Sequence, residues 1–446
     1  MNDKIATTFW ELGQKLQFDE PLSASDERFV DTASARGDFS FTPLLRPYGV
    51  DLRSDAMKFV PTNCYSLFCG HRGCGKSTEL RRLDTMLNRP ERFFVVFLDA
   101  LKELDIHNLS YTDVLMALAK GLLQRITSEN IVIDPVFLYK LHQWFSERID
   151  KHERTREYAA EFKAGAEAAQ GIPFLFKLFA NLTTSFKVGS TYKEELRTVI
   201  RNTYAEFAEA FQQLLDAAAE AVAKSGKGYA VLFIVDGVDR LNKDDSERFF
   251  ISDAHQLLQI RGNFIYCAPI QLTHEHTVVQ QIFSNTYRLP MIKIEDKETG
   301  AKIEDGYRVM REIVYKRAKA NLFDSPETVD YLVRYSGGHP RDLLRLLLNS
   351  FKKAEGEVLD LPAAKAAVRE LATDYRRTLA KEDFALLRAI DNAPDDAPNT
   401  EQVRRLLYHL ALLEYNSYWW RSHPVVRTLP GYRECHVSST TGSGDA

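Results

Sequence analysis

The amino-acid sequence predicts an α/β protein built on a parallel sheet that helices cover on both faces. Two observations lead to this prediction: continuous apolar runs alternate with helical patterns, and a glycine-rich turn joins the first apolar run to the helix that follows it. The chain has 446 residues, of which 45% are hydrophobic and 27% charged, as in ordinary globular proteins. This length is enough for two or three domains.

The strands of the sheet are expected where four to eight apolar residues follow one another without polar interruption. Four such runs predict buried strands and a further run predicts a fifth; they cover 64–70, 92–100, 229–241, 263–270 and 287–294. Between them, apolar residues recur at helical spacing, most clearly in 76–87 and 111–126. The interval before the third strand is long for a compact core. We therefore expect a large helical insert at about 130–225.

Changes in pattern predict the domain boundaries. The core with its insert should cover 56–300, preceded by a mixed polar segment and followed by a helical lid and a winged-helix-like domain, in which helices lead to the aromatic hairpin "SYWWRSHPVV". The last residues are small and polar and predict a disordered tail. The units other than the core are 1–55, 301–360, 361–433 and 434–446.

The glycine-rich turn reads Gly-His-Arg-Gly-Cys-Gly-Lys-Ser and matches the pattern G-x-x-x-x-G-K-[ST] in full. Between a strand and a helix, such a loop directs successive backbone N–H groups at phosphate oxygens. Lys76 is expected to reach the β- and γ-phosphates, and Ser77 to offer its hydroxyl to Mg²⁺. The predicted phosphate-binding residues are Gly70, Arg72, Gly73, Cys74, Gly75, Lys76, Ser77 and Thr78.

Cleavage of a phosphate also requires a carboxylate that holds the metal ion and a group that orients water. The segment "VLFIVDGVDR" places Asp236 at the end of the third strand, where ligands bind in open α/β sheets. We expect Asp236 to hold Mg²⁺ through a water molecule, with capping of the next helix as its alternative role. Asp239 is expected to position the attacking water, with an ordinary loop acid as the alternative.

Together, "GHRGCGKST" and "VLFIVDGVDR" resemble the STAND and KAP-like branches of the AAA+ superfamily of P-loop ATPases. In the commoner AAA+ pattern a glutamate directly follows the metal-binding aspartate, where this chain has Gly237. STAND-type proteins place the acid three positions on, as Asp239 is placed. The resemblance implies a parallel-sheet P-loop core, ATP and Mg²⁺ as ligands, slow hydrolysis and self-association.

The segment "YSGGHPRDLLRLL" is similar to the G-x-P motif of STAND lids. The resemblance implies that Pro340 packs on the adenine and that Arg341 lies near the phosphates, within an origin-recognition-like lid and winged helix. The fourth strand departs from the family pattern, because Cys267 and Gln271 replace the expected polar or basic sensor. No arginine finger can be assigned. The segment 1–55 is expected to wrap the base, with Phe39 or Phe41 as the candidate contact.

These observations predict an ATP-hydrolysing switch that couples its nucleotide state to partner binding or self-association; a role in bacterial stress or phage defence follows by analogy with the family. One alternative is a DNA-binding loader or regulator, in which Arg404 and Arg405 contact the duplex from a recognition helix. Another is a nucleotide-binding interaction module without turnover. The net charge of −4 gives no overall basic excess, which favours a protein partner over DNA.

Cellular context is indicated by what the sequence lacks. The five cysteines fit neither a zinc site nor a disulfide framework, which predicts reduced thiols. The first residues lack the charge and hydropathy pattern of a secretory signal, and no apolar stretch is long enough for a spanning helix. A cytoplasmic protein without a membrane partner is the expectation.

Overall fold

The computed structural model describes residues 4–37, 39–134, 141, 143–144, 180, 191–274, 276–283, 285–415 and 419–435. They form two compact units that do not follow the order of the chain. The first, here called the sheet unit, consists of Phe41–Cys69 and Glu79–Tyr287. The second, here called the lid unit, consists of Met1–Ser40, Gly70–Thr78 and Arg288–Ala446. The glycine-rich loop therefore belongs to the same unit as the C-terminal helices.

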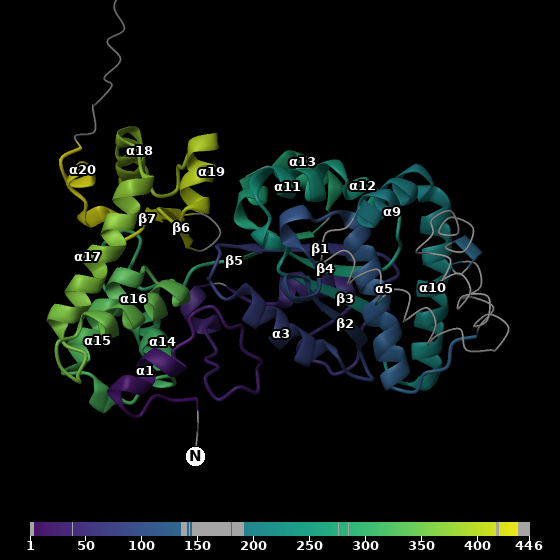
Figure 1. Ribbon diagram of the computed structural model, residues 1–446, viewed down its shortest axis with the longest axis horizontal. Coiled ribbons are helices and arrows are strands. Elements are labelled where there is room, and N and C mark those ends of the chain that lie inside the picture. Colours follow the sequence, from purple (N-terminus) through teal and green to yellow (C-terminus); the bar gives the residue numbers. More distant parts are fainter. Residues whose placement is uncertain are drawn as a thin grey trace, which may run out of the picture. The chain divides into compact units, whose positions relative to one another are not determined.

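A five-stranded sheet, in the order β2-β3-β4-β1-β5, forms the core of the sheet unit (Figure 1). Its neighbours β2 and β3 run parallel, as do β3 and β4. This confirms the predicted α/β fold. The strands are β1 (Cys64–Gly70), β2 (Phe93–Asp99), β3 (Ala230–Asp236), β4 (Asn263–Pro269) and β5 (Asn285–Leu289).

The last strand differs from its prediction. The sequence placed it at 287–294, whereas β5 begins at Asn285 and ends at Leu289. Pro290 comes next, and because proline has no N–H it cannot continue the ladder of hydrogen bonds. The apolar residues after Pro290 are buried without being part of a strand.

The strands β1 to β4 are buried along almost their whole length, so helices pack on the sheet, and the residues that face one side of it join a single core. On β2 these residues are Phe94, Val96 and Leu98, and they join one continuous core with α5 (Tyr111–Ser128) and α10 (Tyr204–Ser225). The remaining helices of the core are α2 (Thr42–Leu45), α3 (Lys76–Leu87), α4 (Ala100–Glu103), α9 (Thr191–Asn202), α11 (Lys243–Glu247), α12 (Ala254–Leu258) and α13 (His276–Ile282).

The predicted insert is represented by α9 and α10, while most of 135–190, including its apolar stretch, lies outside the described residues. Within the part of the chain that is described, none of the helices has the length and apolar character needed to cross a membrane. The five cysteines all lie within the described residues, and none of them is part of a disulfide.

The lid unit is helical and contains a two-stranded antiparallel hairpin close to its C-terminal end. Of the expected tail 434–446, only Glu434 and Cys435 are among the described residues. The helices and strands described in the lid unit are α1 (Phe9–Lys15), α14 (Glu304–Tyr315), α15 (Pro326–Ser336), α16 (Pro340–Lys353), α17 (Leu361–Thr378), α18 (Lys381–Asn392), α19 (Glu401–Tyr408), β6 (Leu412–Tyr415), β7 (Trp419–Ser422) and α20 (Pro430–Arg433).

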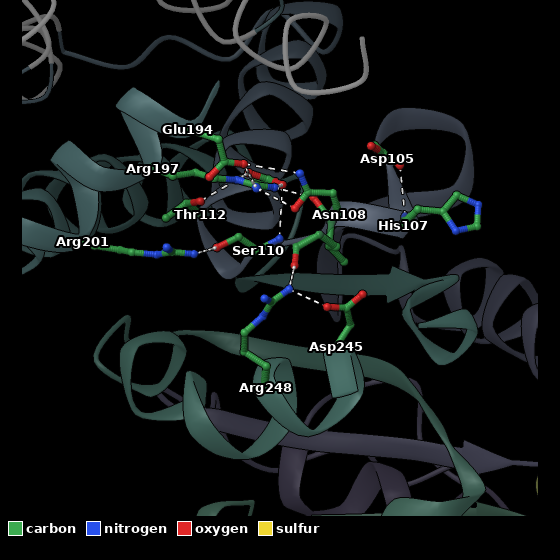
Figure 2. A network of polar contacts seen from close by, with 12 residues as sticks. Asp105, His107, Asn108, Ser110, Thr112, Glu194, Arg197, Arg201, Asp245 and Arg248 are labelled. Atoms are coloured by element: carbon green, nitrogen blue, oxygen red, sulfur yellow. Dashed lines mark hydrogen bonds and ion pairs between the residues drawn. The ribbon is translucent and has the colours of Figure 1, made fainter. Parts of the chain in front are cut away.

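A buried ion pair joins α9 to the first turn of α5 in the sheet unit (Figure 2). Arg197 is 2% exposed; its Nε donates to one oxygen of Asp113 at 2.9 Å and its Nη2 donates to the other. Its Nη1 also donates to Asn108 at 2.9 Å and to Glu194 at 2.6 Å. Because Asp113 accepts the backbone N–H of Ser110 as well, the same carboxylate caps α5 and holds the helix that returns from the insert.

Replacing Arg197 with alanine is expected to lower the free energy of unfolding by about 3 kcal/mol, because the Asp113 carboxylate then stays buried without its cation. The matched control is Glu194→Gln. The Glu194 side chain is 55% exposed, so its change should cost less than about 1 kcal/mol. Urea unfolding followed by circular dichroism measures both variants. Equal losses in the two variants would contradict the assigned role of the buried pair.

Candidate nucleotide-binding site

The glycine-rich loop adopts a backbone that side chains rarely permit. Gly73 and Gly75 have φ values of +88° and +109°, in the left-handed region where glycine alone is unstrained. A Cβ atom on Gly73 would lie 2.8 Å from the Cβ of Arg341 and 2.9 Å from the ring of His339. The glycine at this position therefore permits both the turn of the loop and the close approach of α16.

Lys76 is the first residue of α3 and folds back over the loop. Its ammonium donates to the carbonyl oxygens of Gly70 at 2.7 Å and His71 at 2.8 Å, and the residue is 3% exposed. Ser77 follows in the first turn of the helix and is partly buried. A cationic side chain and the N-terminal N–H groups of a helix thus coincide at the loop, which is the arrangement that binds anions.

The N-terminal segment is tied to the loop through Arg36, a residue that the sequence analysis did not identify. Arg36 is 1% exposed; its Nη2 donates to the carbonyl of Cys74 at 2.7 Å and its Nε donates to Thr32 at 2.8 Å. A second tie is made by Thr78, whose hydroxyl accepts the backbone N–H of Leu22 at 3.3 Å. These contacts fix the backbone of the loop from the side of the N-terminal segment.

Phe41, a candidate contact for the base, packs against two residues of the sheet unit. The residue is 4% exposed, and its ring lies 6.5 Å from the ring of Phe68 and 5.5 Å from the guanidinium of Arg82. The ring is therefore part of the packing of the sheet unit.

The lid helix α16 meets the loop through its N-cap residue. The Nδ1 of His339 accepts the backbone N–H of Asp342 at 3.2 Å, so Nε2 carries the proton and donates to the carbonyl of Arg72 at 2.8 Å. Pro340 is the first helical residue, and Arg341 follows it beside Gly73. The structure thus brings the predicted lid residue Arg341 to the glycine-rich loop.

Two variable positions of the motif bind the C-terminal part of the lid unit. His71 is 1% exposed, and its Nε2 accepts the backbone N–H of Glu414 in β6 at 2.9 Å. Arg72 donates to the hydroxyl of Tyr408 in α19 at 3.3 Å. Burial lowers the pKa of His71 to about 3, so its imidazole is neutral at neutral pH. The motif predicts nothing about these two side chains, which explains why sequence reasoning missed His71.

The second group of predicted residues lies at the carboxyl end of β3 in the sheet unit. Asp236, Asp239 and Cys267 are 3%, 7% and 0% exposed, and one ligand atom from each lies within 4.8 Å of the others. Asp236 ends β3, and Cys267 directly follows Tyr266, the partner of Val235 in the parallel ladder. The register of the two strands therefore brings the thiol to the side of the carboxylate.

Gly237 explains why no glutamate follows the aspartate in this chain. Its φ is +89°, and a Cβ atom there would lie 2.9 Å from the side chain and 3.2 Å from the backbone nitrogen of Leu101. The backbone N–H of Gly237 donates to Asp236 at 2.9 Å. The turn at this glycine returns the chain so that Asp239 lies beside Asp236.

The donor set of this cluster fits a divalent cation. Two carboxylates supply hard oxygen ligands of the kind that Mg²⁺ prefers, and the thiol of Cys267 adds a softer donor. The two aspartates of this cluster were predicted from the sequence as site residues. Cys267 was not predicted as a ligand, although the sequence showed it as a departure from the family pattern.

The arginines of the expected recognition helix are paired with acids. Arg405 forms an ion pair with Asp383, and Arg404 with Glu401 at 3.4 Å. These pairs reduce the positive charge that α19 can offer to phosphates of a duplex.

No protein-family model matches the sequence, and no curated protein matches it either. Two solved structures are similar over most of their length. RuvB, the Holliday junction branch migration motor of Thermotoga maritima, is 10% identical, with a TM-score of 0.34 over 91% of this chain and 96% of its own. Cdc6p from Pyrobaculum aerophilum is 11% identical, with a TM-score of 0.35 over 91% and 97%.

The depressed pKa of His71 predicts a pH-dependent stability. Below about pH 6.5 the unfolded state takes up a proton at this residue, whereas the folded state resists protonation down to about pH 3. Stability contributed by the neutral imidazole is therefore lost as the pH falls through this window. His71→Gln removes the titration and keeps an acceptor for the Glu414 N–H.

As the pH falls from about 6 to about 5, we expect the wild type to lose about 1 kcal/mol of unfolding free energy relative to His71→Gln. Urea unfolding of both proteins at a series of pH values measures it. All other titrating groups are shared and cancel in the comparison. A difference that stays constant with pH would show that His71 titrates normally in the folded protein.

Proposed function

We propose that this protein is an ATP-binding and ATP-hydrolysing switch of the AAA+ type. The observation that carries the proposal is the loop at Gly73 and Gly75, whose left-handed backbone presents the amides that follow while Lys76 lies over it. Asp236 and Asp239, buried side by side at the end of β3, add the acids that a hydrolase requires and that a simple anion site does not.

Binding of the triphosphate rests on the loop. In the proposal, the backbone N–H groups of residues 73–77 hold the phosphate oxygens, and Lys76 turns from the carbonyls it now contacts toward the β- and γ-phosphates. Ser77 contributes its hydroxyl to the metal ion. Pro340 and Arg341 contribute from the lid, Pro340 to the adenine and Arg341 to the phosphates.

Hydrolysis rests on the two aspartates. Mg²⁺, when bound, neutralises charge on the phosphates, and Ser77 and Asp236 are the residues that would hold it. Asp239 is proposed to orient the attacking water and to receive its proton as the bond to the leaving ADP oxygen breaks. A glutamate at position 237 would collide with Leu101, so Gly237 cannot be replaced by the acid of the commoner AAA+ pattern. Asp239 is therefore the acid proposed for this task.

The switch rests on what the loop contacts within the lid unit. Arg36 of the N-terminal segment, His339 of α16 and Glu414 of β6 are each hydrogen-bonded to the loop. Any change in the loop on binding or release of phosphate shifts all three bonds together, which couples nucleotide state to the lid and to the C-terminal hairpin. We propose that these elements report the state to a protein partner or to a second copy of the chain.

The STAND and KAP-like branch is the proposed position within AAA+, on the strength of Asp239 and of the Gly338-His339-Pro340 motif. A cytoplasmic defence or stress-response role is the proposed context, by analogy with that branch.

Replacing Lys76 with alanine is expected to weaken ATP binding by more than about tenfold, because the ammonium supplies a charge-assisted contact to the terminal phosphates. Isothermal titration calorimetry with Mg²⁺ present measures the affinity. Lys102→Ala is the control, since this lysine is 73% exposed and lies outside the loop. Unchanged ATP affinity in Lys76→Ala would contradict the proposed role of the loop in phosphate binding.

Replacing Asp239 with asparagine is expected to slow ATP turnover by about a hundredfold or more while ATP still binds, because the variant retains a polar group but cannot accept the proton. Asp236→Asn should lose turnover as well. Phosphate release measures the rate, with Asp244→Asn as a control at an exposed acid nearby in sequence. Wild-type protein that binds ATP without any phosphate release would favour the module without turnover.

A further inference from the structure

The cation site contains a ligand that its expected chemistry does not require. Cys267 is fully buried on β4, and its sulfur lies within 4.8 Å of a carboxylate oxygen of both Asp236 and Asp239. The strand register, with Val235 opposite Tyr266, fixes this position in the sheet. The sulfur is thus held beside the two acids by backbone pairing as well as by side-chain packing.

A thiol changes the preference of a cation site. Mg²⁺ prefers hard oxygen ligands and gains little from sulfur, whereas Zn²⁺ and Co²⁺ bind thiolate sulfur strongly. When such an ion binds, the S–H bond breaks, a metal–sulfur bond forms, and the proton leaves to solvent. A carboxylate and a thiolate make a mixed set that suits these ions better than an all-oxygen site would.

We propose that Cys267 is a cation-selecting residue, and that Asp236 and Cys267 bind a thiophilic divalent ion such as Co²⁺ or Zn²⁺ through direct sulfur coordination, while Asp239 beside them keeps its role toward the attacking water. The inference deepens the proposed ATPase function, on which its biological meaning rests. Cation choice at this site would then decide which metal–nucleotide complex the enzyme uses.

The experiment uses cobalt as the probe, because a Co²⁺–thiolate bond gives a charge-transfer absorption band in the near ultraviolet. The full chain is titrated with Co²⁺, without and with ATP, in a Cys435→Ser background that removes the one partly exposed cysteine. Cys267→Ser keeps a similar size and replaces sulfur by oxygen, and Cys267→Ala removes the donor. Cys64→Ser is the matched control, since Cys64 is a buried thiol at the first residue of β1, in the same sheet.

The expected result is a band in the parent and in Cys64→Ser that is absent from both Cys267 variants. In Cys267→Ser the Co²⁺ affinity should fall by about tenfold or more, while the Mg²⁺ affinity changes by less than about threefold. No band in the parent, or a band that persists in Cys267→Ser, would overturn the inference.

Failure of the inference and failure of the proposed function are distinguishable. Circular dichroism and Mg²⁺–ATP binding are measured on each variant, so loss of folding is recognised separately. A parent protein that shows no cobalt band yet binds and hydrolyses Mg²⁺–ATP would overturn only the role of Cys267. A parent that shows the band but binds no ATP would overturn only the ATPase.

Discussion

The remaining structure depends on one interaction, in which the ammonium of Lys76 at the start of α3 donates to the carbonyls of its own loop. It concentrates positive charge where two left-handed glycines already turn the backbone. Neighbouring segments converge on this loop: Arg36 and His339 bind its backbone carbonyls, and the N–H of Glu414 binds the ring of His71. These three bonds leave the ammonium of Lys76 and the hydroxyl of Ser77 at the N-terminus of a helix, where anions are favoured.

The ties to the loop come from segments far apart in sequence. An arginine from the N-terminal segment, the N-cap histidine of the lid helix and a backbone N–H of the C-terminal hairpin each make one hydrogen bond to it. Each of these hydrogen bonds alone contributes at most about 1–3 kcal/mol to the free energy of unfolding. Because they share a single short loop, a displacement of that loop is felt by all three segments, which gives the lid unit its capacity to respond.

Much of this arrangement could be predicted from the sequence, since apolar runs reveal buried strands and the glycine-lysine motif reveals the loop. The fifth strand was displaced because the chemistry of Pro290 outweighs the hydropathy of the residues after it. Arg36 could not be found, since it lies in an irregular segment with no periodicity to point at Cys74. His71 occupies a position that the motif leaves open. Cys267 could be recognised from the sequence as a departure from the family pattern, but only the strand register places it beside Asp236.

The most direct test of the account is a crystal structure with a non-hydrolysable ATP analogue and Mg²⁺. The account predicts the β- and γ-phosphates on the backbone N–H groups of residues 73–77, with the Lys76 ammonium rotated from the carbonyls of Gly70 and His71 onto phosphate oxygens. Density for the analogue elsewhere, with Lys76 still bound to those carbonyls, would contradict it.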